Sequence, residues 1–183
     1  MKIQDAKILL IIAFKDFRDE EFMIPYEEFR KKGATVTVCS TELGIAEGMF
    51  HHKIKVDIKI DQAKSKDYNA LIYVGGKGTP TVRSDEAALK LITDSLLEGK
   101  KILAAICWAP TILAKAGALK NKKATVWLGE DSEYRKKTNE VLEQFGAIHS
   151  KENVVVDGNI ITGNGAEAAL LFAQKIIENL ETL

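Results

Sequence analysis

The sequence predicts a doubly wound α/β fold, in which helices cover both faces of a mainly parallel sheet to give a three-layer α/β/α sandwich. Apolar runs alternate with helical patterns along most of the chain, as strand–helix–strand units require. Three runs, at residues 7–14, 70–74 and 102–106, are almost wholly apolar, which is typical of strands buried on both faces. The 183 residues contain no linker-like stretch, so we expect a single domain over residues 1–183.

A strand–helix–strand unit follows from the first apolar run. Apolar residues at helical spacing predict a helix between residues 16 and 33, and residues 35–39 predict the second strand. Pro25 occupies the first turn if this helix begins near Ile24, whereas it bends the first turn if the helix begins before Glu21. Either start places Glu21 near the carboxyl edge of the first strand.

The remaining chain continues the alternation. Residues 40–63 alternate between apolar and polar, which predicts a half-exposed hairpin or edge. After the strand at 70–74, Ser84 with Asp85 and Glu86 is predicted to cap a helix that runs to Gly99. Further elements are predicted in this order: a strand at 102–106, a helix to Gly117, a short strand at 124–128, an amphipathic helix at 130–146, a hairpin at 154–162 around Asp157-Gly158, and a closing helix at 166–180.

Composition excludes several functional classes. The 26 basic and 26 acidic residues balance, so no basic field exists to attract nucleic acid or an anionic membrane. The two cysteines, Cys39 and Cys107, lie outside any metal-ligand spacing, which suits a reducing compartment and argues against a disulfide scaffold or a zinc site. The run at 7–14 is too short to span a bilayer. We therefore expect a cytoplasmic protein that needs neither a metal nor a cofactor.

Cys107 occupies the corner of a predicted strand–turn–helix. The strand runs directly into it, Ala105 and Ala109 are small enough for a tight turn, and Pro110 suits a first helical turn. Such a corner exposes the sulfur at the carboxyl edge of the sheet, where the helix amino end would lower the pKa of the thiol. The alternative is a buried cysteine that packs as a small hydrophobic residue.

Three groups are expected to meet at this sheet edge, because ligands bind outside the carboxyl ends of parallel strands. They are Glu21, the Gly75-Gly76 pair and Cys107. The backbone N–H groups of Gly76 and Trp108 could donate to an oxyanion beside the sulfur, and Glu21 could transfer protons. The alternatives are an ordinary strand-ending turn at the glycines and a solvated Glu21.

Four motifs in this order resemble the DJ-1/PfpI superfamily, and specifically its PfpI-like branch, which has a flavodoxin-like, class I glutamine amidotransferase-like fold. They are Glu21-Phe-Met-Ile-Pro25, Tyr-Val-Gly75-Gly76, Ala-Ala-Ile-Cys107-Trp-Ala-Pro110 and Asn159-Ile-Ile-Thr162-Gly-Asn-Gly165. The resemblance implies that Cys107 is the reactive cysteine, that a protonated Glu21 contacts its sulfur, and that Gly76 and Trp108 are the oxyanion donors. It also implies homodimers or larger homo-oligomers.

The chain departs from this family at two histidine positions. PfpI-type peptidases carry a histidine directly after the cysteine, where this chain has Trp108. DJ-1-like members carry one on the strand after the next helix, where Trp127 stands here. The histidines of this chain, His51, His52 and His149, lie outside the motifs. A thiol that attacks peptides usually needs a base. The case for peptidase activity is therefore weak, unless His51 or His52 enters the site from the hairpin or edge predicted at residues 40–63 or from a second subunit.

Other candidate residues have two interpretations each. Trp108 and Trp127 either form an apolar wall over Cys107 or are ordinary core or interface aromatics. Asn164, between Gly163 and Gly165, either contributes backbone donors to the site or caps the final helix. Cys39 lies inside a strand and is interpreted as inert packing.

The favoured function is a cysteine-dependent enzyme acting on small reactive carbonyl compounds, of the glyoxalase or deglycase type that the resemblance implies. In this hypothesis the Cys107 thiolate adds to the carbonyl and Glu21 shuttles the proton. One alternative is a PfpI-type intracellular cysteine peptidase or amidase with a peptide substrate. Another is a redox-responsive stress protein or chaperone whose Cys107 stops at the sulfinic acid, stabilised by a protonated Glu21.

Overall fold

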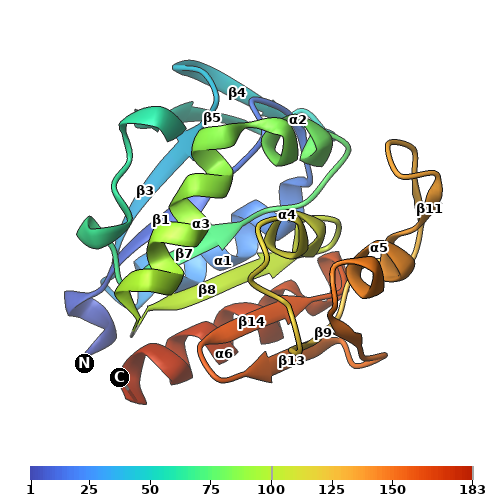
Figure 1. The fold of residues 1–183 in the computed structure, drawn as a ribbon. Helices are drawn as coiled ribbons and strands as arrows, with labels where there is room; N and C mark the ends of the chain where they lie inside the picture. The colour runs from blue at the N-terminus through green and yellow to red at the C-terminus, as the bar shows by residue number, and fades with distance from the viewer. Residues whose placement is uncertain (100, 183) are drawn as a thin grey trace.

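A computed structural model describes residues 1–99 and 101–182, which form the predicted three-layer α/β/α sandwich (Figure 1). Its main sheet is seven-stranded and parallel except for one antiparallel edge pair. The strands in spatial order are β13 (Val154–Asp157), β14 (Ile160–Gly163), β8 (Ile102–Ile106), β7 (Ala70–Tyr73), β1 (Lys7–Ile11), β3 (Thr35–Ser40) and β6 (Ile58–Lys59). The three apolar runs are therefore central strands, as predicted.

Alternate residues of these strands face two separate layers of helices. On one face, α1 (Asp19–Lys31) and α6 (Ala169–Thr182) pack against residues such as Leu10 and Ile72. On the other face, α3 (Glu86–Glu98) and α4 (Pro110–Lys115) pack against Leu9 and Leu71, one position away. Figure 1 shows these helices on opposite sides of the sheet. The period-two alternation of strand side chains thus supplies both cores.

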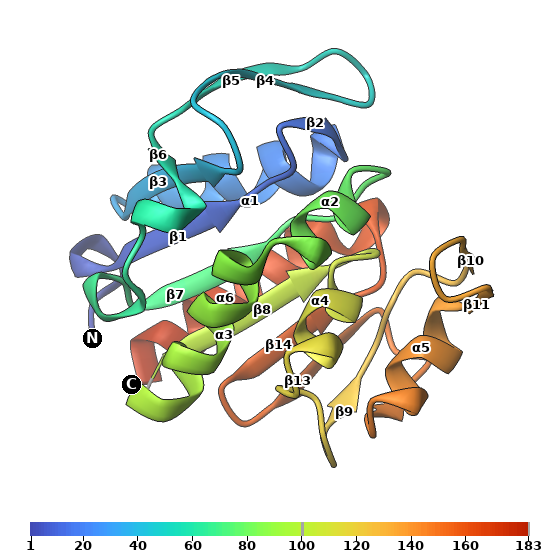
Figure 2. The same cartoon turned by 45° about the horizontal axis from the view of Figure 1, so that its top comes forward.

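The excursion at 40–63 forms the predicted hairpin and also an edge strand. Strands β4 (Gly44–Gly48) and β5 (Lys53–Val56) pair antiparallel, and β2 (Lys15–Phe17) completes a small separate sheet. Figure 2 shows the β4–β5 hairpin projecting beyond β3 and β6. The carboxylate of Asp19 fixes its turn, accepting hydrogen bonds from the backbone N–H groups of Phe50 at 2.9 Å and His52 at 2.8 Å.

One helix start agrees with one of two alternatives left open by the sequence, and another differs in detail from expectation. Helix α1 begins at Asp19, before Glu21, so Pro25 lies inside it rather than in its first turn. Of the predicted capping residues Ser84, Asp85 and Glu86, Ser84 does not cap α3, because it ends a separate helix, α2 (Thr79–Ser84). Asp85 is the cap, accepting hydrogen bonds from Ala87 N and Ala88 N at 2.8 and 3.1 Å.

The prediction is least accurate between residues 123 and 149. Of the predicted strand at 124–128, only Ala124 lies in a strand, β9 (Lys123–Ala124), which pairs with β12 (Ile148–His149). The helix predicted at 130–146 is shorter, since β10 (Glu130–Asp131) and β11 (Lys136–Lys137) form a hairpin before α5 (Thr138–Gln144). The reason is long-range: the Asp131 side chain is fully buried in an ion pair with Arg83 of α2, which holds this segment out of a helix.

The end of the chain follows the prediction. Strands β13 and β14 form the antiparallel hairpin around the Asp157-Gly158 turn, and α6 follows the short 3₁₀ helix η4 (Ala166–Ala168). Other 3₁₀ turns are η1 (Ile3–Asp5), η2 (Ile60–Gln62) and η3 (Ser65–Asp67). No helix within residues 1–99 and 101–182 is both long and apolar enough to cross a membrane.

Candidate active site

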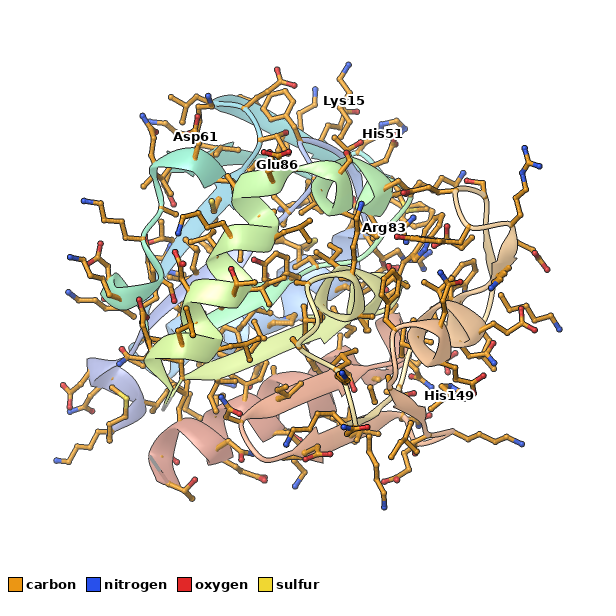
Figure 3. The ribbon with its side chains drawn as sticks, in the orientation of Figure 1. Lys15, His51, Asp61, Arg83, Glu86 and His149 are labelled. Carbon is orange, nitrogen blue, oxygen red and sulfur yellow. The ribbon has the colours of Figure 1, made fainter. Side chains whose placement is uncertain are left out.

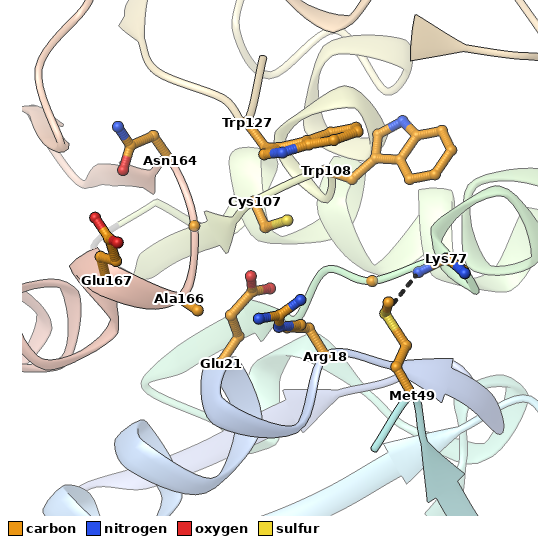
Figure 4. Close-up of a pocket in the computed structure, with 12 residues that line it drawn as sticks. Arg18, Glu21, Met49, Lys77, Cys107, Trp108, Trp127, Asn164, Ala166 and Glu167 are labelled. Carbon is orange, nitrogen blue, oxygen red and sulfur yellow. Dashed lines mark hydrogen bonds between the residues drawn. The ribbon is translucent and has the colours of Figure 1, made fainter. Parts of the chain in front are cut away.

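Cys107 lies at the predicted corner, immediately after β8 and three residues before α4 begins at Pro110. Its φ of +64° lies in the left-handed region, which costs about 1 kcal/mol for a residue with a Cβ. Hydrogen bonds hold the corner on both sides: Cys107 N donates to Gly163 O, and Trp127 N donates to Cys107 O, each at 2.8 Å. The surrounding strands therefore fix a backbone conformation that points the side chain into a pocket (Figure 4).

The two glycines after β7 are required by close approach, so they are more than an ordinary turn. A Cβ at Gly75 would lie 2.6 Å from Cys107 Cβ and 2.8 Å from Glu21 Oε2. Gly76 has a φ of +113°, and a Cβ there would collide with the backbone of Asp16 and Arg18. The end of β7 thus brings the loop before α1 and the β8 corner together.

Glu21 comes from the first turn of α1 and is only 1 % exposed, so it is not the solvated acid of the alternative interpretation. Burial raises the pKa of its carboxyl from 4.5 to about 7, while hydrogen bonding to Cys107, the Arg18 charge and the Gly75 backbone partly oppose this. Within the described part of the chain, its Oε2 atom has no partner of regular hydrogen-bond geometry. Figure 4 shows the carboxyl directed toward Cys107.

The Cys107 thiol is not activated in the predicted way. Burial raises its pKa above the usual range, and the nearby Glu21 charge raises it further. The backbone N–H groups of Trp108 and Gly76 lower this pKa, but they do not outweigh burial. The expected lowering by the α4 amino end is therefore wrong, because burial and the Glu21 charge dominate the pKa of this thiol. Protonation of Glu21 removes the charge repulsion and leaves the two backbone donors in place.

A pocket of about 440 Å³ surrounds this corner. Its walls combine four of the predicted residues, Glu21, Gly76, Cys107 and Trp108, with eight other residues. The complete lining is Arg18, Glu21, Met49, Gly76, Lys77, Cys107, Trp108, Trp127, Asn164, Gly165, Ala166 and Glu167. This volume lies within the range typical of small-molecule sites.

Trp108 and Trp127 form one wall of the pocket, as the first of their two interpretations predicts. Their ring centroids are 5.8 Å apart at an interplanar angle of 46°, and Figure 4 shows both rings above Cys107. Asn164 lines the pocket but offers it no backbone donor, because its N–H donates to Asn153 O at 2.9 Å. Gly165 lies at the cap position of η4, before the final helix.

Sequence reasoning missed four charged or flexible lining residues: Arg18, Met49, Lys77 and Glu167. Arg18 directly precedes α1 and pairs with Glu20 at 2.8 Å, and Met49 follows β4 and accepts a hydrogen bond from Lys77 N at 3.5 Å. Only the position of Arg18, three residues before Glu21, offers a sequence signal. Met49 enters because the hairpin folds back over the site, which no local pattern indicates.

No histidine lines the pocket among the described residues. His51 is exposed and pairs with Glu47 at 2.7 Å, while His52 packs against Phe22 with ring centroids 5.9 Å apart. His149 lies in β12, and Figure 3 shows both His51 and His149 at the periphery. Within one chain, neither His51 nor His52 enters the site.

Two other groups of candidates lie outside the site. Cys39 is fully buried in β3, and burial raises the pKa of its thiol to about 12, as expected of inert packing. Among residues 1–99 and 101–182, no three His, Cys, Asp or Glu side chains are grouped to hold a metal ion.

Comparison with known proteins gives the same assignment as the motifs. The model of the DJ-1/PfpI family matches residues 6–179. The chain is 37 % identical over 179 residues to an uncharacterized protein of Methanocaldococcus jannaschii, covering 98 % of this chain and 84 % of that one. It is 32 % identical over 156 residues to a deglycase of Pyrococcus horikoshii, covering 85 % of this chain and 88 % of that one.

Solved structures agree with the fold. A ThiJ/PfpI domain protein from Brachyspira murdochii superimposes with a TM-score of 0.88 at 28 % identity, covering 97 % of each chain. The family match and the relatives extend over nearly all of the sequence, including the four motifs that first indicated the resemblance. The chain therefore belongs to the DJ-1/PfpI family.

Proposed function

We propose that the protein is a cysteine-dependent enzyme that converts small reactive carbonyl compounds, in the manner of a glyoxalase or deglycase. The observation that supports this most is the buried pair of Cys107 and Glu21. The Glu21 pKa of about 7 lets its carboxyl both accept and donate protons near neutral pH. Relatives in the genus Pyrococcus are named deglycases, which favours the same class of substrate.

The first half of the reaction forms a covalent adduct. Ionised Glu21 accepts the proton of the Cys107 thiol as the sulfur attacks the aldehyde carbon of a 2-oxoaldehyde. The N–H groups of Gly76 and Trp108, which favour negative charge beside the sulfur, stabilise the developing oxyanion. Glu21 then gives its proton to that oxygen, which completes a hemithioacetal and restores the carboxylate.

The second half moves two protons along the substrate. Glu21 removes the C–H proton of the hemithioacetal carbon and returns it to the neighbouring ketone carbon through an enediol, while the proton of the hemithioacetal hydroxyl passes to the ketone oxygen. The aldehyde carbon is thereby oxidised and the ketone carbon reduced, so no external oxidant is required. Water hydrolyses the resulting thioester, and the products are a 2-hydroxy acid and the free Cys107 thiol.

Consumption of methylglyoxal by wild-type protein and by Cys107→Ser tests the proposal. We expect turnover by the wild type and its loss in Cys107→Ser, with the 2-hydroxy acid lactate as the product. Undiminished turnover by Cys107→Ser would contradict the proposal. Fluorogenic peptides tested in parallel distinguish the PfpI-type peptidase, which we expect to be inactive because no histidine of the described chain lines the pocket.

A redox role is the second candidate, because a protonated Glu21 beside the sulfur can donate a hydrogen bond to a sulfinate oxygen. Mass spectrometry after mild peroxide treatment tests it. Stoichiometric sulfinate at Cys107, in a protein that turns over neither methylglyoxal nor peptides, would favour this role over the enzyme. Random oxidation of several residues would contradict it.

A further inference from the structure

Arg83 is an unusual feature of the face that covers the catalytic corner. This α2 residue is fully buried and forms an ion pair with Asp131 of β10, which is also fully buried. The pair is bidentate: Nη1 lies 2.5 Å from Oδ2, and Nη2 lies 3.0 Å from Oδ1. Figure 3 shows Arg83 reaching from α2 toward the segment that holds β10 and β11. A buried ion pair contributes little net stability, so its presence needs another explanation.

Hydrogen bonds connect both side chains of this pair to Trp108. Asp131 Oδ2 accepts a hydrogen bond from the indole Nε1 of Trp108 at 2.8 Å. Arg83 Nη1 also donates to Thr111 Oγ1 at 2.9 Å, and this hydroxyl donates to the backbone carbonyl of Trp108 at 2.8 Å. One guanidinium nitrogen thus contacts both groups that hold Trp108, one at its ring and one at its backbone.

We propose that Arg83 is a positioning residue that fixes Trp108 through Asp131 and Thr111, and thereby aligns both the oxyanion donor and the indole wall of the pocket. The proposal rests on the role of the Trp108 N–H in the proposed function. Arg83 does not line the pocket, so it acts only through Trp108.

The local backbone explains why Trp108 needs the contacts of Arg83, Asp131 and Thr111, which we call the clamp. Trp108 directly follows a residue in the left-handed region, and α4 begins without a side-chain cap at Ala109. The clamp holds the Trp108 ring and carbonyl, while Trp127 N holds the preceding peptide, which carries the Trp108 N–H, by donating to Cys107 O at 2.8 Å. A displacement of 1 Å in a catalytic group can cost about a hundredfold in rate, so the contacts on both sides of Trp108 matter. The centroid of the Tyr134 ring lies 4.7 Å from the Arg83 guanidinium carbon.

Fluorescence tests the positioning independently of any reaction. The chain has two tryptophans, so Trp127→Phe leaves Trp108 as the sole reporter. In this background the paired substitution Arg83→Met with Asp131→Leu removes both buried charges together and frees the indole. We expect a red-shifted emission and at least a twofold increase in acrylamide quenching. Glu133→Gln is the matched control, because Glu133 contacts Arg83 at 2.7 Å but not Trp108. An unchanged emission in the paired variant would overturn the proposal.

Kinetics then test the catalytic consequence. Loss of the indole hydrogen bond to a charged acceptor is expected to lower kcat/KM for methylglyoxal about tenfold in the paired variant. In a Trp108→Phe background, which lacks the indole N–H, the same pair is expected to cost less than about threefold, because the two changes share one interaction. Equal losses in both backgrounds would contradict the clamp.

Two further measurements decide the proposal if the paired variant does not fold or if the wild type turns over no carbonyl compound. If the paired variant does not fold by circular dichroism, Thr111→Val removes the hydroxyl that links Arg83 to the Trp108 carbonyl and leaves that carbonyl only the backbone N–H of residue 111, and we expect a reduced kcat with an unchanged KM. An unaltered kcat in Thr111→Val, together with an unaltered Trp108 emission, would overturn the proposal. If the wild type turns over no carbonyl compound, the proposed function fails, and the fluorescence result still decides whether Arg83 positions Trp108.

Discussion

Replacing Glu21 by glutamine is expected to remove a pH dependence from the stability of this fold. Burial raises the pKa of this carboxyl from 4.5 to about 7, so the folded protein holds the proton at pH values where the unfolded chain has lost it. The stability contributed by protonation is therefore complete below pH 4.5 and is lost as the pH rises to about 7. Integrated over this window, the loss corresponds to about 3 kcal/mol.

Urea denaturation of the wild type and Glu21→Gln between pH 4 and pH 8 measures this quantity. All other titrating groups are shared, so the difference in free energy of unfolding between the two proteins isolates Glu21. We expect this difference to move by about 3 kcal/mol in favour of Glu21→Gln as the pH rises, with most of the change between pH 4.5 and 7. Glu27→Gln, on the exposed side of α1, is the control for removal of one carboxyl charge. A difference that stays constant across the pH range would refute the burial argument.

Three further predictions follow from the geometry of the corner. Because Cys107 has a φ of +64°, Cys107→Gly is expected to be about 1 kcal/mol more stable to urea than Cys107→Ala, and an equal or lower stability would contradict the left-handed conformation. Gly75→Ala places a Cβ 2.6 Å from Cys107 Cβ, so we expect a loss of about 1–3 kcal/mol in thermal denaturation together with loss of turnover; a fully active variant would show that the approach is looser. Alanine at both His51 and His52 is expected to leave methylglyoxal consumption within about twofold. A loss beyond tenfold would instead indicate that a second subunit supplies a histidine.

Much of the fold was predictable because its central strands are covered on both faces. Strands β1, β7 and β8 read as continuous apolar runs for that reason, and the small residues around Cys107 indicated the tight corner. The topology of a parallel sheet then brought Glu21 and Gly76 to the same edge. For the candidate site, this reasoning needed only local patterns and one topological rule.

The errors arise where distant groups decide the local structure. The helical pattern at 130–146 fails at its start because Asp131 is drawn into the core by Arg83, 48 residues earlier. Met49 reaches the pocket only because Asp19 fixes the hairpin turn. The expected lowering of the thiol pKa was wrong because burial, which the sequence does not quantify, outweighs two backbone donors at Cys107. Each of these effects depends on contacts between segments far apart in the chain.

Capture of the covalent adduct tests the central proposal most directly. In Glu21→Gln the thiol can still add to methylglyoxal with water as the proton acceptor, but the proton transfer to the ketone carbon is blocked, so the hemithioacetal should accumulate. Native mass spectrometry with fragmentation, which keeps this reversible adduct intact, is expected to find one methylglyoxal unit on the segment that contains Cys107, and none there in Cys107→Ser. An unmodified Cys107, with adducts only on surface lysines and arginines such as Lys77, would contradict the account.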